Sequence, residues 1–170
     1  MKKKIAILGS TGSIGTTSLN IFKKNKNKFD IILLAANTNY SLICKQIKMF
    51  KPKYYIISNK LVFKKVAKKF KNKKIQIYNN YSNLNFKKKK FDITISSIVG
   101  IAGLSPTIKF VKYTKKILLA NKETIICGWH LIKNLSKTHK TEIIPVDSEH
   151  FSIDQLTRNC KDKDIEKIYL

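Results

Sequence analysis

The sequence predicts an α/β fold built on a doubly wound parallel sheet, and three observations support that prediction. Apolar runs of strand length alternate along the chain with stretches whose apolar residues recur at helical spacing. The apolar runs are continuous, as expected for parallel strands that are buried on both faces. Glycine and proline are scarce, at six and three of 170 residues, which favours regular elements joined by right-handed crossovers.

The first predicted strand, Ile5–Leu8, leads into the glycine-rich segment Gly9–Gly15, and a helix is expected over Thr16–Phe22. The first glycines of the segment can form a tight turn that admits a ligand, and the last lets the helix pack close to the strand. Backbone N–H groups at such a helix start converge on a phosphate. The context favours a Rossmann-like nucleotide-binding unit, although a plain strand–helix turn shares the pattern.

The later elements alternate in the same way. Further strands are predicted at Asp30–Ala36, Tyr54–Ile57, Ile75–Tyr78, Phe91–Ile95, Ile117–Leu119 and Glu142–Val146. Helices are expected at Ser41–Phe50, at Asn59–Phe70, from Pro106 and from Asn121 onward. Ligands on such sheets bind at the carboxyl ends of the strands, so the candidate loops follow Leu8, Ala36, Ile95, Leu119 and Val146.

The loop after the second strand bears on which nucleotide is bound. A site specific for NAD usually has an acidic residue there to hold the ribose 2′-hydroxyl. This chain has Asn37, Thr38 and Asn39 instead, so a 2′-phosphate would not be repelled and NADP is favoured. The loop has no lysine or arginine to bind that phosphate.

The formal net charge is +25, and almost all of the excess is lysine. One explanation is a surface that binds nucleic acid through its phosphates. The other is a compositional drift toward Lys, Asn, Ile, Tyr and Phe, as in AT-rich genomes. Lysines are spread over nearly every segment, and even the run Lys87–Lys90 is typical of a solvated loop, so drift is favoured and no nucleic-acid partner is expected.

The chain has three cysteines that form no paired motif, and these predict reduced, mostly buried thiols: Cys44, Cys127 and Cys160. No apolar run is long enough for a signal peptide or a membrane span. Strand-forming residues begin at Ile5, which leaves no room for a transit segment. A cytoplasmic protein without a membrane partner is therefore expected.

Two clusters of charged residues follow late strands. Lys122 and Glu123 can bind ribose or substrate, or can be an ordinary first turn of a helix. In an extended chain Asp147 and Glu149 would project to one side as hard ligands for Mg²⁺ or Mn²⁺. Alternatively, Ser148 caps a helix that starts near Glu149, and the acids favour its positive end. His150 could be a third ligand, but a role in supporting the ligands or in packing is favoured. Surface or rim positions are expected for His130 and His139.

Four segments together resemble one family, 1-deoxy-D-xylulose 5-phosphate reductoisomerase of the non-mevalonate isoprenoid pathway. The segments are Gly9–Gly15, Ile98–Thr107, Leu119–Glu123 and Pro145–His150. The last two, Ala-Asn-Lys-Glu and Pro-Val-Asp-Ser-Glu-His, are highly specific. The resemblance covers essentially the whole chain, although family members are more than twice as long. This chain departs from the family pattern at Asn37 and Thr38, where the family usually has glycine and a basic residue.

The resemblance implies a set of site residues. NADPH contacts would come from the glycine turn, the loop after the second strand and the Ala-Asn-Lys-Glu segment: Gly9, Thr11, Gly12, Ser13, Ile14, Asn37, Thr38, Asn39, Asn121 and Glu123. Lys122, Ser148 and Glu149 would touch the substrate. Asp147 and Glu149 would bind Mn²⁺ or Mg²⁺, which makes Lys122, Asp147 and Glu149 the implied catalytic residues.

The implied reaction is the NADPH-dependent isomerisation and reduction of 1-deoxy-D-xylulose 5-phosphate, a small phosphorylated sugar, to 2-C-methyl-D-erythritol 4-phosphate. The expected domains are an NADPH-binding unit over residues 1–145 and the start of a catalytic, metal-binding unit over 146–170. In the family a glycine-rich segment follows a strand that would start near Ile165, and a third metal-binding glutamate lies further on. The family is homodimeric. A non-catalytic NADP-binding remnant and one piece of a split enzyme are the alternatives.

Overall fold

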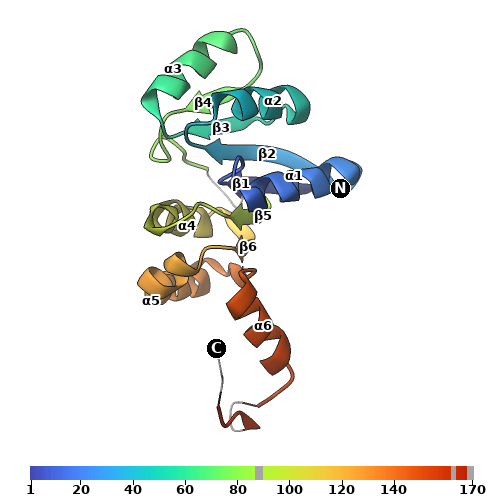
Figure 1. Cartoon of the computed structure of the whole chain (residues 1–170), viewed down its shortest axis with the longest axis vertical. Coiled ribbons are helices and arrows are strands. Elements are labelled where there is room, and N and C mark those ends of the chain that lie inside the picture. The colour runs from blue at the N-terminus through green and yellow to red at the C-terminus, as the bar shows by residue number, and fades with distance from the viewer. Residues whose placement is uncertain (87–89, 162–163, 168–170) are drawn as a thin grey trace.

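The computed structural model describes residues 1–86, 90–161 and 164–167. The described residues contain one parallel sheet of seven strands in the order β4-β3-β2-β1-β5-β6-β7 (Figure 1). The strands are β1 (Lys3–Leu8), β2 (Phe29–Ala36), β3 (Tyr54–Ile57), β4 (Gln76–Tyr78), β5 (Phe91–Ser96), β6 (Thr114–Leu119) and β7 (Glu142–Pro145). The chain starts in the middle of the sheet, winds out to one edge and returns to build the other, which confirms the predicted doubly wound topology.

Helices cover both faces of the sheet. They are α1 (Ser13–Lys24), α2 (Tyr40–Phe50), α3 (Lys60–Lys69), α4 (Leu104–Val111), α5 (Lys122–His139) and α6 (Ser148–Thr157), with a 3₁₀ turn, η1, at Ile101–Gly103. One core joins the sheet to α1, α2 and α3, and two further cores pack its other face against α4 and α5. Helix α6 has no buried residue and runs away from the sheet (Figure 1).

Strand β2 packs against a core on each face of the sheet, which accounts for its continuous apolar run. A bulge shifts its register against β1 at Ile32, so that Ile31 pairs with Ile5 and Leu33 with Ala6. Ile31 and Leu33, on the two sides of the bulge, are buried, and from Leu33 to Ala36 successive residues enter opposite cores. A strand with one polar face could not pack against apolar cores on both faces of the sheet.

Several local expectations need correction. Helix α1 starts at Ser13 rather than Thr16, and Ile21 is exposed because only Gly15 and Leu19 are buried on its inner face. The thiols are free, as expected, but they are not mostly buried. Cys44 is buried, whereas Cys127 lies on the outer face of α5 and Cys160 follows α6, which buries nothing.

Residues 87–89 of the lysine run lie outside the described residues, so the prediction of a solvated loop there is untested. The strand expected near Ile165 is not present in the described residues 165–167. No helix in the described part of the chain is long and apolar enough to cross a membrane.

Candidate functional site

A cleft of about 330 Å³ opens at the carboxyl edge of the sheet. It lies where the chain order reverses between β1 and β5, which is the usual ligand position in doubly wound sheets. Its walls come from the end of β2, from the segments after β1, β2, β3, β4 and β5, and from η1 and the start of α4: Gly9, Thr11, Gly12, Ala35, Ala36, Asn37, Ser58, Tyr81, Ser97, Ile98, Val99, Ala102 and Pro106. The predicted loops after Leu8, Ala36 and Ile95 therefore do converge on one cleft.

The glycine turn depends on two close approaches of backbone that no side chain would permit. Gly9 has φ of +90°, and a Cβ there would lie 2.6 Å from the carbonyl oxygen of Ser97. A Cβ on Gly15 would lie 2.3 Å from the carbonyl oxygen of Gly9. Both distances are shorter than real Cβ contacts allow, so these two positions require glycine. The turn therefore contacts the end of β5 on one side and α1 on the other.

A buried polar cluster fixes the other side of the turn. The Ser10 hydroxyl donates to Gln46 Oε1 at 2.8 Å, and the Tyr55 hydroxyl donates to the same oxygen at 2.7 Å. Gln46 Nε2 donates in return to the Ser10 carbonyl oxygen at 2.7 Å. Burial raises the pKa of Tyr55 well above its ordinary value, so the phenol stays protonated as a donor. This cluster ties the turn to α2 and β3.

Helix α1 presents an uncapped amino terminus to this region. Its N-cap residue is Gly12, which supplies no side-chain hydrogen bond in the described structure. The N–H groups of the first helical residues have no acceptor within a helix, and the helix dipole adds partial positive charge there. The exposed residues Ser13 and Ile14 begin the helix. This terminus can bind a phosphate through backbone N–H groups.

The residues of the loop after β2 differ in whether they line the cleft. Asn37 lines it, whereas Asn39 is the N-cap of α2 and accepts a hydrogen bond from the Leu42 N–H at 3.0 Å. Thr38 is exposed, and its carbonyl oxygen accepts from the Tyr40 N–H. The Asn39 side-chain oxygen is therefore already engaged in holding the start of α2.

Asn121 has a structural role that sequence reasoning missed. Its Nδ2 donates to the carbonyl oxygens of Ile98 and Gly100, and its Oδ1 accepts from the Thr124 N–H at 2.9 Å. The side chain is 3% exposed and holds the 98–100 loop, which lines the cleft, against the start of α5. Asn121 thus positions the cleft wall, whether or not it also touches a ligand.

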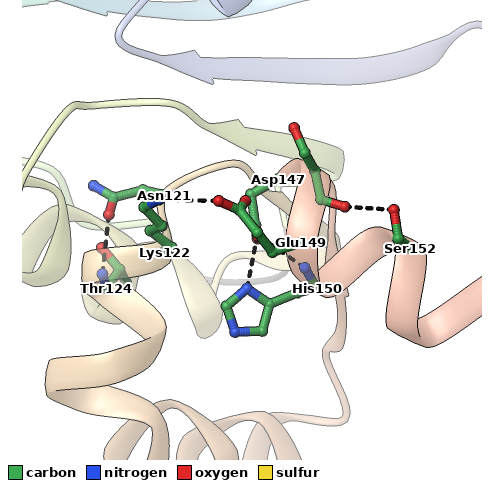
Figure 2. A network of polar contacts seen from close by, with 8 residues as sticks. Asn121, Lys122, Thr124, Asp147, Glu149, His150 and Ser152 are labelled. Carbon is green, nitrogen blue, oxygen red and sulfur yellow. Dashed lines mark hydrogen bonds and ion pairs between the residues drawn. The ribbon is translucent and has the colours of Figure 1, made fainter. Parts of the chain in front are cut away.

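A second group of predicted residues meets where α5 and α6 begin (Figure 2). Lys122 Nζ lies 3.0 Å from Glu149 Oε1, and both side chains are about half exposed, at 52% and 49%. The pKa of Lys122 is raised by its hydrogen bond to Glu149. The pKa of Glu149 is lowered, first by its own backbone N–H at the helix start and then by Lys122.

The expectation of an extended chain at Asp147–Glu149 is wrong. Asp147 is the N-cap of α6 and Glu149 lies in its first turn, so the helical alternative holds, with Asp147 rather than Ser148 as the cap. Asp147 Oδ1 accepts from the His150 N–H at 3.1 Å and lies 2.7 Å from His150 Nδ1. Burial raises the Asp147 pKa, but the hydrogen bonds from the His150 ring and backbone outweigh burial and lower it.

The carboxylates suit a hard divalent cation in one specific respect. Asp147 Oδ2 is buried and has no hydrogen-bond partner among the described residues, which leaves a carboxylate oxygen for a cation. In the described ranges no group of three or more His, Cys, Asp or Glu residues could hold a metal. A cation here would rest on Asp147 and Glu149 and would take its other ligands from water or substrate.

The structure thus separates the predicted residues into two groups at one edge of the sheet. Gly9, Thr11, Gly12 and Asn37 line the cleft, with Ser13 and Ile14 at the adjoining helix start. The second group gathers at the starts of α5 and α6: Asn121, Lys122, Glu123, Asp147, Ser148 and Glu149. Cleft residues that sequence reasoning missed include Ser58, Tyr81 and Ser97, which lack motifs and are identified only by their place at strand ends.

Comparison with known proteins places the chain in a family. The family model for 1-deoxy-D-xylulose 5-phosphate reductoisomerase matches residues 5–128. Curated reductoisomerases of that name are 47% identical in Pelagibacter ubique and 42% identical in Thermodesulfovibrio yellowstonii, and each match covers 99% of this chain but 44% of the relative. The chain belongs to this family and corresponds to an amino-terminal portion that spans less than half of those relatives.

Solved structures of the family agree. The enzyme from Zymomonas mobilis in complex with NADPH superposes with a TM-score of 0.80 at 27% identity, over 88% of this chain and 40% of that one. A DOX-P reductoisomerase in complex with NADPH, fosmidomycin and magnesium gives a TM-score of 0.81 at 30% identity, over 90% of this chain and 38% of that one.

Replacing Gly15 with alanine should destabilise the fold by about 1–3 kcal/mol, because the new methyl group would overlap the Gly9 carbonyl oxygen. The matched control is Gly12→Ala, whose Cβ would lie 3.4 Å from the same oxygen in near-ordinary contact. Urea unfolding followed by circular dichroism measures both variants. Equal stability of the two would contradict the steric account of the turn.

Replacing His150 with alanine should raise the pKa of Asp147, since the ring hydrogen bond that opposes burial is removed. In the native chain the lowered pKa means that Asp147 stabilises the fold above its unfolded pKa near 3.8, and that this contribution is lost as pH falls through the lower folded pKa. Carbon-detected NMR titration reports each carboxyl separately. Glu142, which pairs with Lys116, is the internal control, and an unchanged Asp147 titration would refute the assignment.

Proposed function

We propose that this chain provides the NADPH-binding unit and two metal-binding carboxylates of a 1-deoxy-D-xylulose 5-phosphate reductoisomerase. The reaction is the isomerisation and reduction of that sugar phosphate to 2-C-methyl-D-erythritol 4-phosphate. One observation carries the proposal. The contact of Lys122 with Glu149 lies at the same sheet edge as the glycine-lined cleft, beside the Asp147 oxygen that has no partner among the described residues.

The cleft and the α1 terminus would hold NADPH. The cofactor phosphates would bind the N–H groups at Ser13 and Ile14, while the turn at Gly9 and Gly12 admits the chain of the cofactor close to the backbone. Asn37 would face the ribose, where the lack of an acid tolerates a 2′-phosphate. The reductoisomerases of known structure that bind NADPH share this fold.

The second group would bind metal and substrate. Asp147 and Glu149 would hold Mg²⁺ or Mn²⁺, which when bound supplies a Lewis acid that stabilises negative charge on the substrate oxygens. Lys122 already pairs with Glu149, so its ammonium is positioned to orient the sugar phosphate and to offset negative charge. Ser148, at the first position of α6, would add a hydroxyl or an N–H group to the same ligand.

The domain division follows from this assignment. Residues 1–145 would form the cofactor unit, and 146–170 would begin the catalytic unit of the family. Helix α6 supports the division because none of its residues is buried against the sheet unit. The relatives are more than twice the length of the matched segment, and a homodimer is the proposed assembly for the complete enzyme.

The cofactor assignment predicts a change of preference in Asn37→Asp. A carboxylate at this position would repel the 2′-phosphate and accept from the ribose hydroxyl, so the ratio of NADPH to NADH affinity should fall by about tenfold. Fluorescence titration of the full 170-residue chain with each cofactor measures the ratio, and weak NADPH binding is expected for the unaltered chain. Asn20→Asp on the exposed face of α1 adds the same charge as a control. An equal ratio in both variants would refute the placement of the ribose at Asn37.

The reaction assignment is tested in a chimera. Residues 1–170 of this chain replace the matching segment of the Pelagibacter ubique relative, with which they share 47% identity. The chimera should oxidise NADPH only with sugar phosphate and Mn²⁺, whereas the 170-residue chain alone should not turn over. Asp147→Asn should lower kcat/KM by about a hundredfold or more, since a metal ligand supplies several kcal/mol.

Asp154→Asn is the matched control, because Asp154 pairs with Arg158 further along α6 and away from the proposed metal. A folded chimera without activity would contradict the reductoisomerase proposal and favour a non-catalytic NADP-binding remnant. Metal- and substrate-dependent turnover by the 170-residue chain alone would contradict the claim that the site needs the remaining half.

A further inference from the structure

A second groove, of about 400 Å³, lies at the opposite edge of the sheet from the proposed cofactor cleft. It forms where α2 and α3 end and where β3 and β4 begin. Pro52 lies just before β3 and Ile75 immediately before β4, so both mark the amino edge of the parallel strands. The groove is therefore distinct from the site already described.

The floor of the groove is apolar. Ile47 and Phe70 are 4% and 6% exposed and belong to the core between the sheet and α1–α3. Pro52 is buried, and Ile75 packs against the same core. A short hydrocarbon group would therefore meet a preformed apolar surface of the size that small ligands occupy.

The rim of the groove is cationic. Its remaining lining residues are four exposed lysines, Lys48, Lys51, Lys73 and Lys74, and no acid lines the groove. The sequence contains no aspartate or glutamate between Asp30 and Asp92, so the segment that forms the groove supplies no carboxylate of its own to neutralise them. The ion pairs formed by the described residues all involve other side chains.

Hydrogen-bonded turns hold the rim in place. Lys51 ends α2 in the left-handed region with φ of 46°, and its N–H donates to the Ile47 carbonyl oxygen. On the other side the Lys73 N–H donates to the Phe70 carbonyl oxygen, and the Ile75 N–H donates to the Lys73 carbonyl oxygen at 2.8 Å. The lysine backbones are thus ordered before any ligand arrives, which lowers the entropic cost of binding.

We propose that this groove binds a small amphiphilic organic phosphate, with a short alkyl tail on the apolar floor and a phosphate or diphosphate head between the lysines. The lysines are spread through the whole sequence, but here four of them surround one apolar floor. Single-stranded nucleic acid typically stacks its bases on exposed aromatic rings, and the aromatic ring of the groove, Phe70, is buried in the floor. The groove is concave, which suits a free ligand better than a flat membrane surface.

The test uses n-hexyl diphosphate as the probe, with inorganic diphosphate and 1-hexanol as the separate head and tail. Calorimetry on the full chain should show n-hexyl diphosphate binding about tenfold or more tightly than inorganic diphosphate, because part of the tail is buried. Amide shifts in NMR spectra should move at residues 47–51 and 70–75. Equal affinity for both diphosphates would reveal an adventitious ion only and would overturn the proposal.

A variant set locates the head group. Replacing Lys48, Lys51, Lys73 and Lys74 with glutamine should weaken n-hexyl diphosphate binding by about tenfold or more. The control replaces four exposed lysines elsewhere, Lys2, Lys26, Lys133 and Lys137, and so has the same net charge. Equal losses in the two variants would overturn the proposal, as would binding to anionic phosphatidylglycerol vesicles without binding to the free probe. Thermal unfolding of both variants confirms that each is folded.

Discussion

The close approach of backbone to backbone at the glycine turn is the constraint on which the rest of the structure depends. Gly15 lets α1 contact the Gly9 carbonyl, and Gly9 in turn lets the turn contact Ser97 after β5. These contacts place β1, β5 and the start of α1 within one tight junction at the point where the strand order reverses. The Ser10–Gln46–Tyr55 cluster adds α2 and β3 to that junction. The cleft lies beside this junction.

The starts of several helices, which carry partial positive charge, lie at this same edge of the sheet. They differ in whether a side chain caps them. The start of α1 has no side-chain cap, so its N–H groups are available to an outside anion. The starts of α5 and α6 are capped by Asn121 and Asp147, so their positive ends are partly satisfied from within. This difference matches the proposed roles. An uncapped terminus suits a phosphate, whereas a capping carboxylate suits a cation when one of its oxygens has no partner in the described part of the chain.

The fold could be predicted from the sequence because its signals are local. Continuous apolar runs, helical spacing and a glycine turn between them place nearly every element within a few residues. The site was harder to predict than the fold, because the contacts that shape it join residues far apart in the chain. Nothing near Gln46 or Tyr55 marks them as partners of Ser10, and the two-residue spacing of Asp147 and Glu149 suits a strand as well as a helix start. The helix forms because Asp147 caps it through the His150 N–H, a contact that spacing alone does not reveal.

The two halves of the proposed site differ in how much of each this chain contains. The glycine turn, which is proposed to bind phosphate, is formed and braced by residues 8–97, through the Gly9, Ser10 and Ser97 contacts. The proposed metal site has two carboxylates, one paired with Lys122 and the other engaged as a helix cap. A cation would have to compete with the Lys122 ammonium for Glu149, and two ligands without a third give it little advantage. Tight metal binding would therefore require oxygen atoms from outside these residues, so the proposed cofactor binding can be tested separately from the proposed metal binding.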